Sequence, residues 1–274
     1  GSGPRGALMA AGFLELHSPG RPLLMPNPWD VGSAVLFESM GFKALATTSS
    51  GFAATLGRLD GGVTRDEAIA HAADVAAAVE VPVSADLENA FAREPEGVAE
   101  TVRLAIEAGL AGCSVEDFSG DEGDPIYDAG LAAERVAAAV EAARAAGREF
   151  VLTARAENHV RGRDDLADTI ARLQAFEEAG ADVLFAPGVR ELADIRELIG
   201  SVSRPVNVLA MPGVPAVAEL AEAGVARISV GGAFAYTAYG AAAEAARGLL
   251  EYGTYGYWDT AGKGAHAVQT AFKR

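Results

Sequence analysis

The chain has 274 residues, half of them apolar, and 22 Lys and Arg against 38 Asp and Glu give it a formal net charge of -16. The size and the apolar fraction favour a globular protein with a substantial core. The negative charge argues against nucleic acid and anionic membrane surfaces as partners, and no run reaches the ~18 consecutive apolar residues of a membrane helix. The single cysteine, Cys113, excludes an intrachain disulfide and fits a cytoplasmic location.

Along the chain, short apolar runs alternate with longer Ala-, Glu- and Arg-rich stretches. The apolar runs predict strands at 23–27, 44–49, 81–87, 112–117, 150–157, 182–188, 205–210 and 226–231. Apolar spacings of three and four predict helices near 32–40, 64–79, 95–109, 131–147, 164–180, 191–202, 214–224 and from 233 onward. Because the strands read as continuously apolar, we expect a parallel sheet covered on both faces.

Eight β-α units without an intervening linker predict one α/β domain, a (β/α)₈ (TIM) barrel over 1–274. An open doubly wound sheet is the alternative, disfavoured because no Gly-x-Gly-x-x-Gly follows the first strand. Residues 254–274 contain aromatic side chains but no ninth strand, so they are predicted to be a C-terminal appendage that is helical at its end. The Ala-rich helix from Ala233 and this appendage suit either a subunit contact or packing against the chain's own barrel.

Polar side chains follow the predicted strands where each strand ends. The candidates are Asp60, Asp86, Glu88, Glu116, Asp117, Arg155, Glu157 and His159. In a barrel of this kind the C-terminal ends of the strands meet at one rim, where the active site is built. Carboxylates gathered there would repel one another unless a cation neutralised them, and oxygen ligands suit Mg²⁺. The sequence therefore predicts a divalent metal site.

Each of these residues also has a plain structural interpretation. A single acidic residue at a strand end is often a helix cap, Cys113 is an ordinary core residue, and Arg155 could serve only as an ion-pair partner of Glu157 or Glu116. An arginine beside a metal cluster, however, is also suited to bidentate capture of a substrate carboxylate. The small-residue turn 47–52 has backbone N–H groups that could hold an anion.

Several stretches together resemble the isocitrate lyase/phosphoenolpyruvate mutase superfamily. They are "NPWDVGSA", "TTSSGFAATLGRLDGG", "PVSADLENAF", "GCSVED", "FVLTARAE", "EEAGADVLFAPG" and "RPVNVLAMPG", followed by "ELAEAGVARISVGGA". The resemblance implies Asp86 as a direct Mg²⁺ ligand, with Mn²⁺ as a possible substitute, and Asp60, Glu88 and Glu116 as ligands through water. It further implies a barrel whose last helix is exchanged between subunits of a homodimer or homotetramer.

The same resemblance implies a small 2-oxo or 2-hydroxy carboxylate as substrate. By it, the catalytic residues are Arg155, Asp60 and Glu116. The substrate-binding residues are Trp29, Asp30, Ser49, Ser50, Gly51, Phe52, Asp86, Arg155 and Asn207.

One loop departs from the superfamily pattern. Lyases that resemble isocitrate or methylisocitrate lyase carry a Lys-Lys-Cys-Gly-His lid after the fourth strand, and the mutases carry Lys and Asn there. Residues 118–130 read "FSGDEGDPIYDAG", without Lys, Cys, His or Asn. The acid that protonates a departing enolate and the groups that hold a phosphoryl are therefore absent from this loop.

The leading prediction is a Mg²⁺-dependent carbon–carbon lyase or decarboxylase that acts on a small 2-oxo or 2-hydroxy acid such as oxaloacetate through a metal-stabilised enolate. The alternatives are aldol-type cleavage of a larger 2-hydroxy or 2-oxo acid, a C–C hydrolase, a methylisocitrate lyase-like or phosphonomutase-like enzyme, and a protein that binds a 2-oxo dicarboxylate without turnover.

Overall fold

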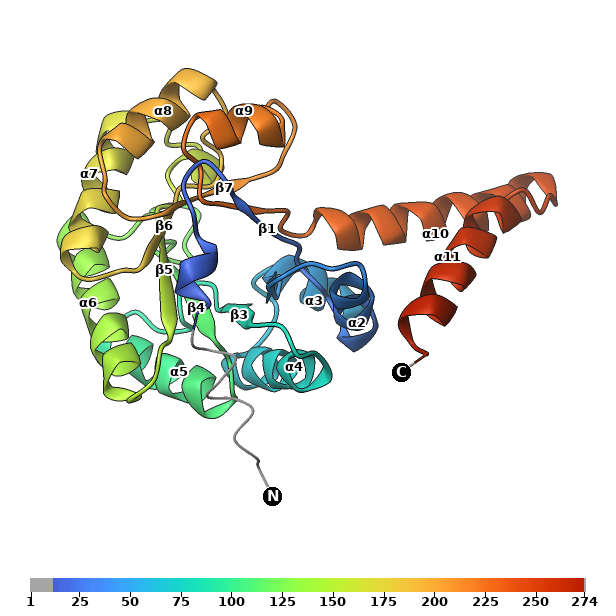
Figure 1. Ribbon diagram of the computed structural model, residues 1–274, viewed down its shortest axis with the longest axis horizontal. Coiled ribbons are helices and arrows are strands. Elements are labelled where there is room, and N and C mark those ends of the chain that lie inside the picture. Colours follow the sequence, from blue (N-terminus) through green and yellow to red (C-terminus); the bar gives the residue numbers. More distant parts are fainter. Residues whose placement is uncertain (1–11, 274) are drawn as a thin grey trace.

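The strands of the computed structural model, which describes residues 12–273, form one parallel barrel (Figure 1). Residues 1–11 and 274 of the predicted domain lie outside the described residues. The strands are β1 (Leu23–Met25), β2 (Leu45–Ala46), β3 (Val83–Asp86), β4 (Gly112–Glu116), β5 (Val151–Arg155), β6 (Val183–Phe185), β7 (Val206–Leu209) and β8 (Arg227–Ser229). Each strand from β2 to β8 pairs with the next, and β8 pairs with β1.

The remaining seam, between β1 and β2, is bridged by two hydrogen bonds. The Ala46 N–H donates to the Pro26 carbonyl at 3.2 Å, and the Asn27 side-chain amide donates to the Thr47 carbonyl at 3.1 Å. All eight predicted strands are present, and the predicted (β/α)₈ barrel is confirmed.

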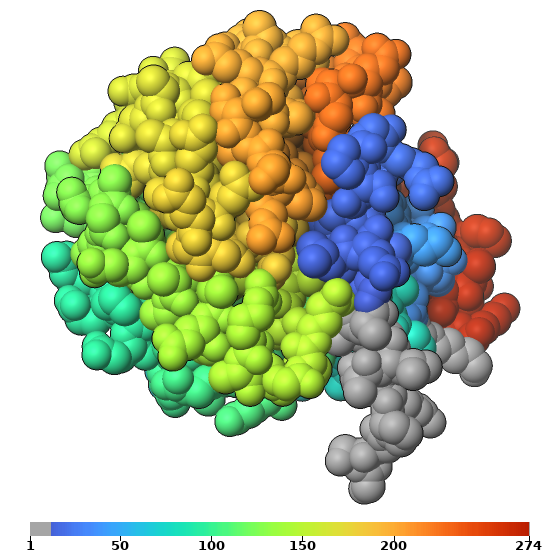
Figure 2. All heavy atoms as spheres, turned by 60° about the vertical axis from the view of Figure 1, so that its left-hand side comes forward, coloured from blue at the N-terminus to red at the C-terminus, as the bar shows by residue number. Residues whose placement is uncertain are grey.

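Helices between the strands form the outer layer of the barrel. They are α2 (Val31–Ser39), α3 (Ser49–Thr55), α4 (Arg65–Ala78), α5 (Pro95–Glu107), α6 (Ala129–Ala145), α7 (Leu166–Glu178), α8 (Leu192–Gly200) and α9 (Val217–Glu222). Figure 2 shows α6, α7 and α8 as a continuous surface. Two short 3-10 helices are also present: η1 (Leu14–Leu16) precedes β1, and η2 (His159–Arg161) lies between β5 and α7.

Local sequence explains several helix boundaries. Thr64 and Glu67 form a capping box at the start of α4, in which each side chain accepts from the other residue's backbone N–H. Pro95 occupies the first turn of α5, where its missing N–H costs nothing. After α5, Gly109 adopts a φ of +83°, the left-handed conformation that ends helices and that glycine adopts without strain.

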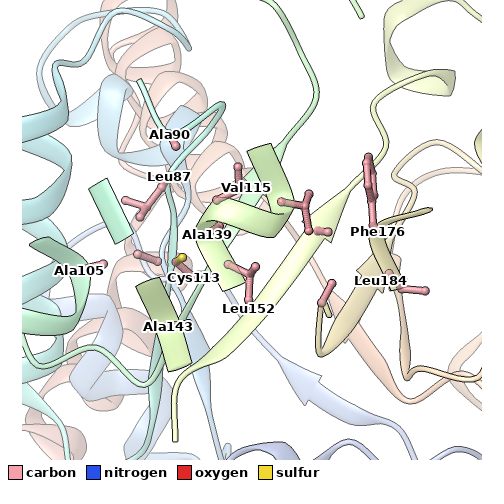
Figure 3. Packing of buried hydrophobic residues seen from close by; sticks show 14 of the residues in the cluster. Leu87, Ala90, Ala105, Cys113, Val115, Ala139, Ala143, Leu152, Phe176 and Leu184 are labelled. Carbon is pink, nitrogen blue, oxygen red and sulfur yellow. The ribbon is translucent and has the colours of Figure 1, made fainter. Parts of the chain in front are cut away.

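The main hydrophobic core lies between the outer side of the strands and the helices that cover them. Figure 3 shows part of it, with Cys113 of β4 and Leu152 of β5 packed against Ala139 and Ala143 of α6. Cys113 is completely buried, and this burial raises the pKa of its thiol. It is therefore a core residue rather than a nucleophile, as its place in the strand indicates.

Several side chains inside the barrel are small and polar. They are Ser84, Ser114, Thr153, Asn207 and Ser229, one from each of β3, β4, β5, β7 and β8, and they lie beside the larger Arg227 and Met25. Bulky branched residues usually fill this space in barrels of this type. The small side chains leave an internal cavity of about 200 Å³ that opens toward the C-terminal ends of the strands.

The last two helices do not cover the barrel. α10 (Ala233–Tyr252) extends away from it past α3, and α11 (Trp258–Ala271) turns back toward α2 (Figure 1). Large apolar side chains along this segment remain exposed, including Phe234, Tyr236, Tyr239, Leu249, Leu250 and Trp258. None of the helices within residues 12–273 is both long and apolar enough to cross a membrane.

Candidate active site

Two adjoining cavities occupy the C-terminal end of the barrel. The inner cavity, of about 200 Å³, reaches into the barrel, and the outer one, of about 320 Å³, lies below the 118–130 loop. Ser49, Asp60, Arg155 and Leu209 line both. The position agrees with the rule that barrel active sites form at the C-terminal ends of the strands.

Arg155, at the end of β5, lies at the junction of the two cavities and contacts carboxylates from three strands or strand ends. Its guanidinium nitrogens lie 3.2 Å from Asp86, 3.2 Å from Glu116 and 2.8 Å from Glu157. Although burial by itself lowers the pKa of Arg155, these negative charges raise it above its usual value. The guanidinium is therefore permanently charged, and it holds the acidic cluster together.

Asp86 ends β3 and lies beside Arg155. Its Oδ2 accepts from the Ser49 N–H at 3.0 Å, and its Oδ1 accepts from Arg155 at 3.2 Å and from the Glu88 N–H at 3.3 Å. Its own N–H donates to the Thr47 hydroxyl at 2.9 Å. These bonds fix the carboxylate at the wall of the inner cavity, where its side chain stays 16 % exposed and within reach of a ligand.

Asp60 and Glu88 are the acidic neighbours of Asp86. Burial, followed by the charges of Asp86 and Asp60, raises the pKa of Glu88 to about 8; burial and the Asp86 charge also raise that of Asp60. Glu88 has a φ of +51°, an uncommon conformation for a residue with a side chain, and Ala90 and Phe91 share it. Strain of this kind concentrates at functional sites.

Glu116 and Asp117, the last residues of the "SVED" stretch, have different surroundings. Burial and the charge of Glu157 raise the pKa of Glu116 well above its usual value, and Glu116 lines the outer cavity. Asp117 points away from the cavities: it accepts from the Glu157 N–H at 2.8 Å and from Arg172 at 3.2 Å. Asp117 is therefore a structural partner, whereas Glu116 belongs to the candidate site.

The stretch 47–52 begins a helix instead of forming a turn. Thr48 caps α3, and its hydroxyl accepts from the Gly51 N–H at 3.3 Å, while the Ser49 N–H is bonded to Asp86. The N–H groups of Thr47 and Phe52 are also bonded, to the carbonyls of Ser84 and Thr48, so four of the six N–H groups expected to hold an anion are already engaged. Ser49 and Ser50 line the inner cavity. Gly51 is buried where a Cβ would meet Thr48 and the Trp29 side chain.

The structure does not bring the other predicted substrate-binding residues of this region to the two cavities. Asp30 caps α2, its carboxylate accepting from the Ser33 N–H at 2.7 Å, and Trp29 packs edge-on against Phe37. Phe52 stacks on the His71 ring, with centroids 3.8 Å apart. Asn207 does line the inner cavity; its amide donates to the Ser229 hydroxyl at 2.9 Å and accepts from Arg227 at 3.0 Å.

Sequence reasoning missed three basic or aromatic residues near the site. The guanidinium carbon of Arg161, in η2, lies 3.5 Å from the centre of the Phe118 ring, and one of its nitrogens lies 3.8 Å from the Glu122 carboxylate. Arg161 therefore contacts the 118–130 loop. Burial lowers the pKa of His71 to about 4, and its buried Nε2 has no hydrogen-bond partner among the described residues. Arg227 lies inside the barrel. His71 and Arg227 carry no local motif, and only the folded chain brings them near the cavities.

The carboxylates fit a magnesium ion held mainly through water. Within residues 12–273, no three His, Cys, Asp or Glu side chains are placed to ligate one ion together. Mg²⁺ usually keeps several waters and takes only one or two protein carboxylates. Burial and the neighbouring carboxylates raise the pKa values of Asp60 and Glu88, and a cation beside Asp86 would favour the charged forms of both.

Comparisons with known proteins agree with this geometry. The family model for phosphoenolpyruvate phosphomutase matches residues 13–250. The chain belongs to this family. It lies within a superfamily of carbon–carbon lyases and mutases: a 2-methylisocitrate lyase of Escherichia coli is 29 % identical over 211 residues, 70 % of each chain. An uncharacterized protein of Mycobacterium tuberculosis is 35 % identical over 241 residues, 87 % of this chain and 89 % of that one.

Solved structures give the same result. A Burkholderia cenocepacia protein provisionally assigned as a lyase/mutase superposes with a TM-score of 0.95 at 46 % identity, covering 99 % of this chain and 98 % of that one. A 2,3-dimethylmalate lyase superposes with a TM-score of 0.80 at 27 % identity, covering 92 % and 89 %. The resemblance inferred from the sequence is confirmed at the level of the superfamily.

Proposed function

We propose that the protein is a Mg²⁺-dependent carbon–carbon lyase that acts on a small 2-oxo acid, with decarboxylation of an oxaloacetate-like substrate as its reaction. The observation that carries this proposal is the arrangement of Asp60, Asp86 and Glu88 around Arg155 at the mouth of the barrel cavity. Asp86 would hold the ion directly, and Asp60, Glu88 and Glu116 would hold it through water. Mg²⁺, when bound, polarises the carboxylate and 2-oxo oxygens of a substrate.

The protein's own residues would orient the substrate. Arg155 places a permanent positive charge at the cavity wall, where it attracts a substrate carboxylate, and Ser49 and Ser50 supply hydroxyl groups at the same wall. Breaking the bond to a carboxylate of a 3-carboxy-2-oxo acid releases CO₂ and leaves an enolate, which takes one proton to become the 2-oxo acid. Solvent can supply this proton, so the step requires no acid from the 118–130 loop.

The 118–130 loop favours this chemistry over the other reactions of the superfamily. It brings the Phe118 ring and the Glu122 carboxylate to the outer cavity. Neither is a cysteine or histidine of the kind that protonates a departing enolate, and a carboxylate repels a phosphoryl group. We therefore infer that isocitrate cleavage and phosphoryl rearrangement are not the reactions of this protein.

NMR of oxaloacetate with the protein and Mg²⁺ tests the proposal, with Mg²⁺ alone as the blank. Enzyme-dependent pyruvate is the expected product. Formation of oxalate plus acetate would show that the reaction is hydrolysis instead of decarboxylation. Unchanged substrate with ligand-shifted protein signals would indicate binding alone. Asp86→Asn should abolish pyruvate formation, whereas Asp66→Asn, the same change at a carboxylate 84 % exposed on α4, should not.

We also propose that α10 and α11 pack against a second copy of the chain, in a homodimer or homotetramer with exchanged helices. The support is the position of α10, which leaves the barrel and exposes a series of large apolar side chains. Monomeric proteins rarely expose so extended an apolar surface. A partner's barrel would bury it and complete the helical layer beside α2 and α3.

A further inference from the structure

Arg227 is a buried cation that has no carboxylate partner. Its side chain extends from β8 into the barrel and is 3 % exposed. It donates to the Asn207 amide oxygen at 3.0 Å and to the Thr153 hydroxyl at 3.1 Å, and lies 3.2 Å from His17 Nε2. Within residues 12–273 no Asp or Glu forms an ion pair with it, and residues 1–11 contain neither residue type.

All three partners of Arg227 are neutral. Burial and the Arg227 charge lower the pKa of His17 to about 3, so its imidazole is uncharged at neutral pH. His17 Nδ1 lies 3.1 Å from the Phe13 carbonyl, which can only accept, so Nδ1 carries the proton and Nε2 accepts from Arg227. The guanidinium is thus solvated by dipoles alone, with three of its five N–H donors bonded within the described residues.

This arrangement leaves a charge without compensation. Burial and the like charge of Arg155 lower the pKa of Arg227 to about 9, which still leaves the guanidinium charged at neutral pH. A buried charge without a counter-ion is costly, and proteins keep one where it is paired or where a ligand completes it. An anion that entered the barrel would be strongly attracted to Arg227.

The inner cavity provides the route for such an anion. Arg227 lines the same cavity as Asp60, Asp86 and Arg155, with hydroxyl groups of Ser84, Ser114 and Ser229 on its walls. Arg227 bonds to Thr153, which lies two residues before Arg155 on β5, about 7 Å along the strand. The cavity therefore has carboxylates at its mouth and a cationic end inside the barrel, with Arg227 and Asp86 lining the same enclosed space.

We propose that the inner end of this cavity is an anion subsite, in which Arg227 receives the substrate carboxylate remote from Asp86. The inference rests on the proposed function for the identity of the substrate as a 3-carboxy-2-oxo acid, and it assigns the residue that receives the second carboxylate of that substrate. Asn207 and Thr153 orient the guanidinium, and the serine hydroxyl groups complete the lining. The positive charge at this end selects against monocarboxylates such as pyruvate, which supports release of a monocarboxylate product.

Calorimetry with the Mg²⁺-loaded protein separates the two ends of the cavity. The probes are oxalate, which can occupy the metal end alone, and 3,3-difluorooxaloacetate, which carries a remote carboxylate. Arg227→Gln should weaken the affinity for 3,3-difluorooxaloacetate by about 30-fold or more, because a buried charge partner is lost. The same change should weaken the affinity for oxalate by less than about threefold. Arg227→Lys, which keeps the charge, should recover part of the difference.

The control is Arg148→Gln, which removes a partly buried arginine outside the cavity whose partners are backbone carbonyls; it should leave both affinities unchanged. An equal loss for both probes in Arg227→Gln would assign Arg227 to structure and overturn the proposal. So would unchanged affinity for both.

A second measurement uses the wild-type protein and remains valid if Arg227→Gln does not fold. Crystals grown in bromide without substrate should show an anomalous peak in contact with the Arg227 guanidinium, and absence of a peak there would overturn the subsite. Failure of the proposed function has a different signature: oxalate and 3,3-difluorooxaloacetate would then both fail to bind the wild type, while the bromide peak would persist. Bromide at Arg227 together with equal affinities for pyruvate and oxaloacetate would refute the dicarboxylate assignment.

Discussion

Replacing Arg155 with lysine tests whether this residue captures substrate or only holds the acidic cluster together. Arg155 contacts Asp86, Glu116 and Glu157 at 2.8 to 3.2 Å, and a single ammonium group cannot reach all three. Each lost charge-assisted hydrogen bond costs about 1.5 to 3 kcal/mol. Lysine keeps the charge and water can enter the space left by the guanidinium, so we take the low end of this range for each of two lost hydrogen bonds. The expected loss is about 3 kcal/mol of unfolding free energy.

The effect on catalysis follows from the same geometry. If Arg155 also forms a fork with the substrate carboxylate, Arg155→Lys should lower kcat/KM for oxaloacetate by about 100-fold, or about 2.7 kcal/mol. Urea unfolding and steady-state assays with Mg²⁺ measure the two effects separately, with Arg103→Lys at the exposed Arg103–Glu100 pair as the control. A loss of stability with unchanged kcat/KM would refute substrate capture and leave Arg155 a structural partner.

Four other predictions concern the metal, the pH response, the assembly and the loop. EDTA should abolish activity and Mg²⁺ or Mn²⁺ should restore it, with Asp86→Ala the most damaging single change; full activity of demetallated protein would contradict the metal site. Since the folded pKa of Glu88, about 8, lies above its ordinary 4.5, metal-free protein should lose stability as pH rises from about 5 to 8, and urea unfolding of Glu88→Gln should show a smaller loss. Sedimentation should show a dimer or tetramer, and deletion of 233–274 should give insoluble protein; a soluble full-length monomer would end the exchange model. Isocitrate and methylisocitrate should be cleaved with kcat/KM well below ~10⁴ M⁻¹s⁻¹. A kcat/KM near this value would mean that another residue replaces the acid of the lid, and His159 would be the first residue to test by mutation.

The barrel was predictable because its signals are local and repeated. Apolar runs and helical spacings recur eight times, and glycines such as Gly109 and Gly180 mark helix ends. The predicted strand 44–49 was too long: β2 spans only Leu45–Ala46, because Thr48 caps a helix that begins at Ser49. Side-chain capping by Thr48 decided this boundary, and a pattern of apolar residues does not reveal it.

The acidic part of the candidate site was also predictable, since Asp86, Glu88, Glu116 and Arg155 all follow strands that converge at one rim. The basic part inside the barrel was not. Arg227 and His17 are 210 positions apart and meet only because η1 lies near β8 in the folded chain. The orientation of Asp117 toward Arg172 depends likewise on the placement of helix α7, which no local spacing encodes.

Cys113 offers a practical probe of this fold. It is the only cysteine in the chain and lies fully enclosed between β4 and α6. A thiol reagent can therefore label it only in molecules whose barrel has opened, so the labelling rate reports the opening of the core itself rather than of a loop. Measured with and without Mg²⁺, that rate would show whether an ion at the rim steadies the whole barrel, with no tag, no engineered residue and no knowledge of the substrate.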